Sequence, residues 1–181
     1  IDTVDKLKAK FKQDSSIIHD KKAIGLKYFD DLEERIPRQE MDAYNSKLKE
    51  ICTKVSSTII MSINGSYRRG LPTSGDIDLM ITSKTEDPSK LRKLLIKELT
   101  KQGIIQATMA SGKKKFMGVA QISGNDPFRI DIFMVSKENW WVAMVTHTGP
   151  KELNTQMRTI AATMGMKLSD QGLKKGTEKI P

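Results

Sequence analysis

The chain has 181 residues and a mass of 20.4 kDa, enough for one large domain or two small ones with a real hydrophobic core. Lysine and arginine number 31 against 22 acidic residues, and this net charge of +9 favours an anionic partner such as nucleic acid, although a merely solubilising surface would also be basic. Cys52 is the single cysteine, which excludes an internal disulfide and a thiolate metal cluster.

Two helices and two strands are predicted in the first 82 residues. Apolar spacing predicts a helix over residues 21–37, marked by Ile24, Tyr28 and Leu32 and ended by Pro37. A longer helix follows, with an apolar face formed by Met41, Tyr44, Leu48, Ile51, Cys52 and Val55. The β-branched run 58–63 predicts a strand, and residues 76–82 predict its partner across a turn rich in glycine and arginine.

The second half of the chain predicts a helix, three strands and two more helices. The helix covers residues 88–103, with Gly103 where a C-cap belongs. Strands are expected at 104–110, 115–123 and 128–135, and their short connections make them antiparallel neighbours. Helices are expected at 136–147 and 149–165, and no element is predicted after Gly172. The predicted fold class is mixed α/β (α+β), a mixed sheet with packed helices.

Three aspartates carry the chemistry that this pattern predicts. Asp76 and Asp78 are two positions apart on a strand, so their side chains point to the same face. Asp131 interrupts the apolar strand 128–135, where a carboxylate is costly to bury unless it is paired or bound to metal. If this strand lies next to the first, the three acids form an all-oxygen cluster suited to Mg²⁺ or Mn²⁺. Two such ions can activate a hydroxyl and stabilise leaving pyrophosphate.

The turn before these acids has the residues of a phosphate site. Gly65 allows a tight backbone, Ser66 offers a hydroxyl, and Arg68 and Arg69 can pair with phosphate oxygens. Taken alone, an Asp-x-Asp pair is often a solvated strand edge, and two arginines in a loop are usually surface charge. Their combination, followed by a distant aspartate in a strand, is much more specific.

On these motifs the chain resembles the family X DNA polymerases of the nucleotidyltransferase superfamily, and their polymerase β branch most closely. Beyond "GSYRRGLPTSGDIDLMIT", the resemblance is carried by "GLKYFDDLEERIPRQEM", "KKFMGVAQI", "FRIDIFMV" and "HTGPKELNTQMR", which occur in the family's order. It covers roughly residues 20 to 173. It implies a nucleotidyltransferase palm, flanked by helical fingers-side and partial thumb segments.

The resemblance also implies roles for individual residues. Asp76, Asp78 and Asp131 match the catalytic aspartates that bind two Mg²⁺ or Mn²⁺ ions. The positions implied to bind the incoming nucleotide are Arg35, Gly65, Ser66, Arg69, Gly75, His147, Thr148, Gly149, Lys151 and Asn154. Those implied to contact DNA are Lys115, Arg129 and Arg158.

Helical spacing gives independent support to part of this assignment. Lys151, Asn154 and Arg158 fall on one side of the last predicted helix, and an ordinary solvated face is the alternative interpretation. The opposite, buried side is expected to hold Leu153, Met157, Ile160 and Met164.

Two positions depart from the family pattern. Thr146 and His147 stand where polymerase β relatives usually carry an aromatic pair, against the sugar of the incoming nucleotide. We hypothesise that His147 packs beneath the sugar as a flat ring and that exclusion of ribonucleotides is weakened. Lys151 stands where polymerase β usually has an acidic residue, which puts base-pair checking in doubt.

The implied function is templated DNA synthesis of the repair type, with dNTP as substrate and gapped or primed DNA as partner. Template-independent terminal transfer is one alternative, and a non-catalytic module that binds DNA ends is another. The expected divisions are a helical segment over 1–37, a catalytic palm over 38–137 and a partial thumb over 138–181. We expect no lyase activity from this chain, which trapping of a Schiff base with borohydride would test.

The single cysteine favours a reducing, intracellular setting, and no apolar run is long enough to imply a membrane partner. A monomer is expected. The nucleus, or a viral or host-cell compartment, is the expected location.

Overall fold

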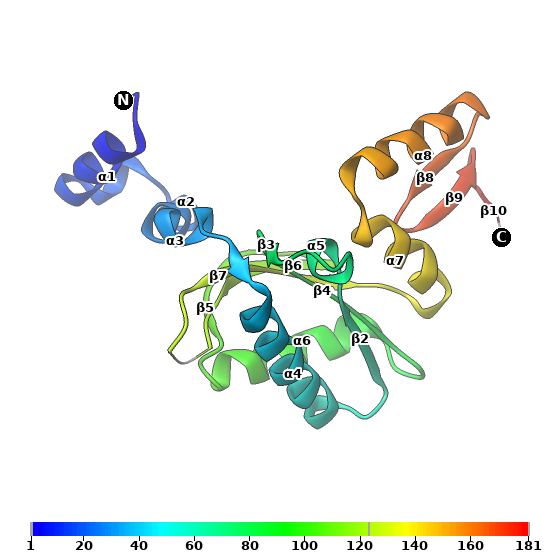
Figure 1. Ribbon diagram of the computed structural model, residues 1–181, viewed down its shortest axis with the longest axis horizontal. Coiled ribbons are helices and arrows are strands. Elements are labelled where there is room, and N and C mark those ends of the chain that lie inside the picture. Colours follow the sequence, from blue (N-terminus) through cyan, green and yellow to red (C-terminus); the bar gives the residue numbers. More distant parts are fainter. Residues whose placement is uncertain (1, 123, 181) are drawn as a thin grey trace.

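The computed structural model describes residues 2–122 and 124–180, and the chain forms three groups of elements along its length (Figure 1). The first group is helical and lies at one end of the molecule (Figure 1). Its elements are α1 (Val4–Gln13), the short 3-10 helix η1 (Ser15–Ile17), α2 (Asp20–Lys27) and α3 (Phe29–Glu33). Thr3 caps α1, since its hydroxyl accepts a hydrogen bond from the Lys6 amide at 3.3 Å.

A five-stranded mixed sheet forms the centre of the molecule. Its strands, in spatial order, are β2 (Ile59–Ile63), β4 (Ile77–Ser83), β7 (Phe128–Met134), β6 (Lys115–Ala120) and β5 (Ile105–Ser111). β4 and β7 are parallel, whereas every other pair is antiparallel. The prediction that the last three strands of this sheet are antiparallel neighbours is confirmed. So is the mixed fold class.

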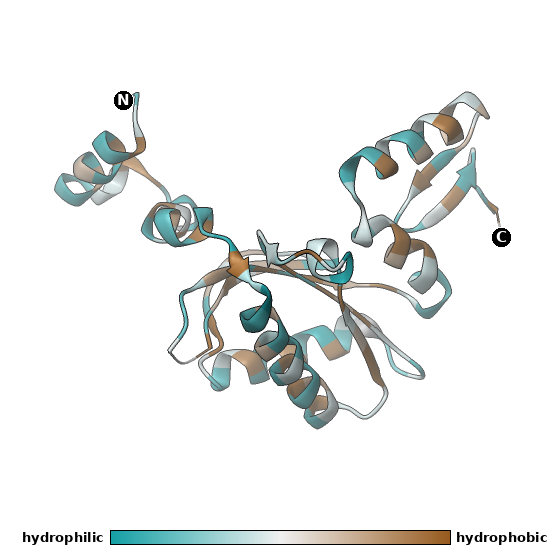
Figure 2. Cartoon of the chain, in the orientation of Figure 1, coloured by the Kyte–Doolittle hydropathy of each residue, from teal (hydrophilic) through white to brown (hydrophobic). Residues whose placement is uncertain are grey.

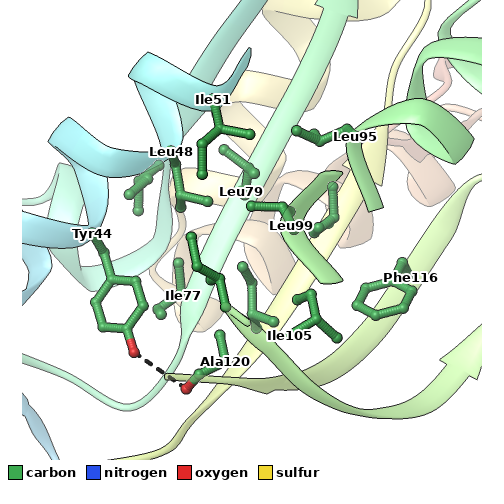
Figure 3. Close-up of a cluster of buried hydrophobic side chains, with 14 of the residues drawn as sticks. Tyr44, Leu48, Ile51, Ile77, Leu79, Leu95, Leu99, Ile105, Phe116 and Ala120 are labelled. Atoms are coloured by element: carbon green, nitrogen blue, oxygen red, sulfur yellow. Dashed lines mark hydrogen bonds between the residues drawn. The ribbon is translucent and has the colours of Figure 1, made fainter. Parts of the chain in front are cut away.

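Helices α4 (Arg38–Val55) and α6 (Pro88–Lys101) cover one face of this sheet and enclose the main core (Figure 3). The predicted apolar face of α4 is confirmed, because Met41, Tyr44, Leu48, Ile51 and Cys52 are all buried. Figure 2 shows apolar residues concentrated in the sheet and on the inner sides of these helices. The hydroxyl of Tyr44 donates to the carbonyl of Ala120 and accepts from the amide of Ile122, both at 3.2 Å.

The opposite face of the sheet holds a smaller core. Helix α7 (Trp140–Thr148) follows the 3-10 turn η2 (Lys137–Asn139) and packs Trp140, Ala143 and Met144 on Met80 and Val135. After it come α8 (Lys151–Thr163) and a three-stranded antiparallel sheet of β8 (Lys167–Ser169), β9 (Gly172–Lys175) and β10 (Glu178–Ile180). Among the described residues, no helix is both long and apolar enough to cross a bilayer.

Several sequence predictions were wrong in detail. The helix predicted over 21–37 is divided at Tyr28, whose dihedrals (φ −102°, ψ 16°) are not helical. The segment after Gly172 was predicted to have no element, yet it forms β9 and β10. These strands are short and rich in lysine, so their sequence has no apolar alternation. The pairing of β9 with β8 and of β10 with β9 fixes them instead. Helix α1 and the two-residue strands β1 (Ile36–Pro37) and β3 (Thr73–Ser74) were not predicted.

The apolar stripe of α8 is the largest error. Leu153, Ile160 and Met164 were predicted to be buried but are 41, 60 and 60% exposed. The only buried residue of this helix is Ala161. Helix α8 packs on β8, and a stripe of large apolar residues indicates an amphipathic helix without showing which neighbour covers it.

Candidate active site

The three aspartates meet at one end of the two parallel strands. Asp78 on β4 and Asp131 on β7 are direct register partners, and Asp76 immediately precedes β4. One carboxylate oxygen of each residue lies within 4.8 Å of those of the other two. The side chains of neighbouring strands at matched positions point to the same face, which is why a distant strand can complete the cluster. The sequence prediction that the strands are adjacent is therefore confirmed.

Two cations offset part of the negative charge of this cluster. The ammonium of Lys115, on β6, lies 2.8 Å from Oδ2 of Asp131, and the guanidinium of Arg129, on β7, pairs with Oδ2 of Asp76. Asp131 is buried, and its Oδ1 has no hydrogen-bond partner among residues 2–122 and 124–180. A buried carboxylate oxygen without a partner is costly, so the cluster is incomplete without a further positive group.

Asp78 is repelled by the charges of the two neighbouring aspartates. Burial, followed by the charges of Asp76 and Asp131, raises the pKa of Asp78 to about 7. Gly65 lies directly against this carboxylate, because a Cβ atom at Gly65 would be 2.5 Å from Oδ2 of Asp78. Gly65 also has a φ of +57°, which glycine adopts without strain. The glycine that begins helix α5 (Gly65–Arg68) thus lets the backbone approach the acids.

The residues of this cluster fit a divalent metal. Three carboxylates supply an all-oxygen donor set, of the kind that Mg²⁺ and Mn²⁺ prefer. The unpartnered Oδ1 of Asp131 and the raised pKa of Asp78 both indicate that a positive charge would stabilise the group.

A cleft of about 630 Å³ opens beside the acids. One wall comes from α5 and the loop before β4, and the other comes from the end of α7 and the start of α8. All ten residues implied to bind nucleotide line this cleft: Arg35, Gly65, Ser66, Arg69, Gly75, His147, Thr148, Gly149, Lys151 and Asn154. Arg158 lines it too, whereas Lys115 and Arg129 lie beside it as partners of the acids.

Hydrogen bonds hold several of these side chains in place. Arg35 donates from Nε to the hydroxyl of Thr73 at 2.7 Å and from Nη2 to its carbonyl at 2.9 Å. Arg69 connects the two walls, donating from Nη1 to the carbonyl of Thr148 at 2.6 Å. Asn154 donates to the carbonyl of Thr146 at 2.7 Å. The wall formed by α7 and α8 is therefore tied to the wall that carries the acids.

The cleft carries charges of both signs. It is lined by two acids, Asp76 and Asp78, and by four cations, Arg35, Arg69, Lys151 and Arg158. This arrangement suits an elongated polyanion whose charge is shared between arginines and a metal ion.

The ring of His147 is stacked on Phe133, with centroids 4.1 Å apart and planes tilted by 36°. The ammonium of Lys115 lies 4.8 Å from the centroid of the same phenylalanine ring. Burial lowers the pKa of His147 below its ordinary value, although Asp170, with Oδ2 3.9 Å from Nε2 of the histidine, opposes this shift. His147 is thus a flat, neutral ring at neutral pH.

Sequence reasoning missed three residues at this site. Thr155 and Leu71 line the cleft, and Asp170 lies near His147. Thr155 follows Lys151 by one helical turn, which was a usable signal. Leu71 and Asp170 lie outside any predicted element, and no pattern indicated them.

Comparisons with known proteins agree with this geometry. The family model of the DNA polymerase beta palm matches residues 35–137, and that of the DNA polymerase beta thumb matches residues 143–181. DNA polymerase lambda of Arabidopsis thaliana is 29% identical over 174 residues, which are 90% of this chain and 33% of that protein. DNA polymerase lambda of Rattus norvegicus is 30% identical over 159 residues, 83% of this chain and 28% of that protein. This chain therefore spans about a third of the length of these curated relatives.

Solved structures give the same result at the level of the fold. Polymerase beta of Leishmania infantum in a ternary gap complex superposes with a TM-score of 0.89 at 32% identity, covering 97% of this chain and 62% of that one. In a ternary P/T complex the same enzyme gives a TM-score of 0.86 at 31% identity, covering 97% and 70%.

Proposed function

Because the chain belongs to the family X DNA polymerases, we propose that it transfers a nucleotidyl group from a dNTP to a primer 3′-hydroxyl and releases pyrophosphate. Short gaps in duplex DNA are the proposed substrate. The observation that carries this proposal is the register pairing of Asp78 with Asp131, with Asp76 beside them, next to a cleft that four cations also line.

The arginines of the cleft are proposed to hold the triphosphate. Arg35 and Arg69 are kept in place by carbonyl and hydroxyl groups, so little side-chain freedom is lost when phosphate oxygens replace water on their remaining donors. Gly65, Ser66 and Gly75 leave the backbone open beside them. Thr148 and Gly149 form the opposite wall. The result is positioning, which lowers the barrier without a covalent intermediate.

The start of α8 is proposed to contact the bases. Asn154, fixed to the carbonyl of Thr146, and Lys151 line the cleft and are proposed to meet the base edge of the incoming nucleotide. Arg158, one turn further along α8, is proposed to reach the template strand. His147 is proposed to lie against the sugar. Lys115 and Arg129, near the acids, are proposed to meet the DNA at the primer terminus.

The acids are proposed to hold two Mg²⁺ or Mn²⁺ ions. Asp76, Asp78 and Asp131 would be their ligands, and bound metal would supply the charge that activates the 3′-hydroxyl and stabilises the leaving pyrophosphate. Asp131, buried and with Oδ1 free, is the acid proposed to lie nearest the attacking hydroxyl. Lys115 keeps Oδ2 of the same carboxylate fixed.

A gapped substrate is supported by the likeness to a polymerase β in a ternary gap complex. The connection between β6 and β7, from Ala120 to Phe128, is short. The terminal transferases that this family includes tend to carry a long loop between these strands, so templated synthesis is favoured over terminal transfer. The experiment is extension of a primer across a one-nucleotide gap with each dNTP in turn. Extension by only the complementary nucleotide supports the proposal. Equal extension by all four would indicate terminal transfer, and DNA binding without extension would indicate a binding module.

A further inference from the structure

β2 is an open edge of the central sheet, with β4 as its one neighbour in that sheet (Figure 1). Its register with β4 is regular from Ile59 to Ile63. The amide of Asn64 donates to the carbonyl of Asp78 at 2.8 Å, and the carbonyl of Thr58 accepts from the amide of Lys84 at 3.1 Å. Antiparallel pairing alternates, so the even-numbered residues bond to β4 and the odd-numbered ones point their N–H and C=O groups away from it.

The outward backbone of β2 is therefore available to another strand. The amide of Ile59 is used within the turn, where it donates to the carbonyl of Ser56 at 3.2 Å. Within residues 2–122 and 124–180, no hydrogen bond joins the N–H or C=O of Met61 to a neighbour beyond β2. Met61 thus presents one donor and one acceptor side by side, as the edge of an antiparallel sheet does.

The two edges of the sheet differ in how they are protected. β5, at the other edge, has register shifts between Ile105 and Ala107 and between Thr108 and Ala110. Such irregularities bend a strand and discourage pairing. β2 has no shift in register, no proline and no charged residue in its sequence IIMSI. An unprotected edge of this kind is a site where a further strand can add.

A groove of about 480 Å³ runs along this edge. It is lined by the apolar Ile59, Met61 and Ile63 of β2 and by three cations, Arg38, Lys49 and Arg68. Lys49 and Arg68 are exposed and form no ion pair within the described residues, whereas Arg38 donates to the carbonyls of Tyr67 and Leu71.

No carboxylate lines the groove in the described part of the chain. Asp42 is close by, but it accepts a hydrogen bond from the hydroxyl of Tyr67 at 2.7 Å.

We propose that this groove binds an extended acidic peptide segment of another protein, which adds to β2 as a sixth strand of the sheet. Its backbone would pair with Met61, its carboxylates would lie on the face covered by α4 and meet Lys49 and Arg68, and its alternate apolar side chains would lie on the other face beside Ile60. Nucleic acid fits less well, because phosphate oxygens only accept hydrogen bonds and leave the carbonyl of Met61 without a donor. A second copy of this chain fits less well too, since edge-to-edge pairing would bring the same cations together.

The groove and the active cleft share helix α5 but use different residues of it. Gly65 and Ser66 line the cleft, whereas Tyr67 and Arg68 line the groove. A peptide on β2 therefore leaves the cleft open, and the partner acts as a tether that leaves the enzyme free to bind DNA.

Fluorescence anisotropy with a short labelled peptide of alternating valine and glutamate tests this proposal. We expect saturable binding that weakens as salt is added, and a loss of roughly fivefold in affinity for Lys49→Glu. Lys93→Glu is the matched control, because it makes the same charge change at an exposed position on α6 outside the groove. A peptide with valine and lysine should not bind.

Backbone pairing is tested separately by the same acidic peptide with alternate amides methylated, which should bind at least roughly tenfold more weakly. Amide exchange at Met61 should slow when the unmodified peptide is added. Equal binding of the methylated peptide, or an equal effect of both lysine substitutions, would overturn the proposal. So would dimers of the free chain held together through β2, or DNA binding that Lys49→Glu weakens while no peptide binds.

Discussion

Asp78 and Asp131 are opposite one another on parallel strands, and among the described residues only Asp131 forms an ion pair with a cation. Lys115 pairs with Asp131, while Asp78 is left between two acids and against the backbone of Gly65. The register of the two strands brings the three carboxylates close together. Because Lys115 neutralises Asp131 and not Asp78, the site has more negative than positive charge. Metal binding and metal-free stability are therefore linked through Asp78.

Asp78→Asn should stabilise the metal-free fold while abolishing nucleotide transfer. The pKa of Asp78 is raised to about 7 in the folded chain. The folded state holds this proton up to higher pH than the unfolded state does, so stability is lost as pH rises from the ordinary carboxyl pKa to about 7. The substitution should thus add roughly 2 kcal/mol at pH 8 in EDTA and little near pH 4. Thermal unfolding at both pH values measures this, and an equal effect at both would contradict the account.

Gly65→Ala should impair catalysis more than stability. Its Cβ would be 2.5 Å from Oδ2 of Asp78, so the carboxylate must move. We expect the rate to fall roughly a hundredfold, since small displacements of catalytic groups are costly. Gly70→Ala is the control, because Gly70 also has a positive φ, of +81°, but open space around its Cβ. The rate of gap filling and the thermal unfolding temperature are measured for both variants. An equal loss of rate in both would show that backbone strain alone is responsible.

Tyr44 should make the fold sensitive to alkali. Burial raises the pKa of Tyr44 to about 12, above its ordinary value. The neutral hydroxyl is favoured in the folded chain, so stability is present below the unfolded pKa of about 10 and is lost as pH rises toward 12. Tyr44→Phe should cost about 1 kcal/mol at pH 7, because it removes the bonds to Ala120 and Ile122, and the cost should shrink above pH 10. Urea unfolding at pH 7 and pH 11 measures this. A cost that grows with pH would refute the prediction.

Placing an aromatic pair at positions 146 and 147, which are proposed to lie against the sugar of the incoming nucleotide, should increase the preference for dNTP over rNTP. His147 is a flat ring held on Phe133, and Thr146 beside it is small. In the double variant Thr146→Tyr with His147→Phe, we expect exclusion of ribonucleotides to rise roughly tenfold. The measurement is the ratio of incorporation efficiencies for dCTP and CTP opposite guanine, compared with polymerase β. An unchanged ratio, or a native chain as selective as polymerase β, would contradict the hypothesis that exclusion is weakened.

Sequence reasoning succeeded where one local pattern had one structural solution. The alternation around Asp76 and Asp78, and the single acid in the apolar strand of Asp131, can form a stable group only if their strands are adjacent. The apolar face of α4 was equally definite. In each case the pattern within the element itself identified the side that is buried.

The failures occurred where tertiary partners decide the outcome. The apolar residues of α8 form a regular stripe, but Leu153 and Ile160 face solvent in the described part of the chain. Strands β9 and β10 have glycines at their turns, Gly172 and Gly176, with φ of +109° and +60°, and little else in their sequence that predicts pairing. Asp170 reaches His147 only because that small sheet folds back beside α7. None of these contacts leaves a periodic signal.

The most direct test of the central claim is single-nucleotide extension in a gapped duplex as a function of Mg²⁺, with Asp131→Asn as the matched variant. Asparagine keeps the size of the side chain and removes the charge that pairs with Lys115. We expect the native chain to extend the primer only when Mg²⁺ or Mn²⁺ is present, and the variant to be at least roughly a thousandfold slower with its fold intact. Extension without divalent metal, or at the native rate in the variant, would show that these three carboxylates are not the transfer site.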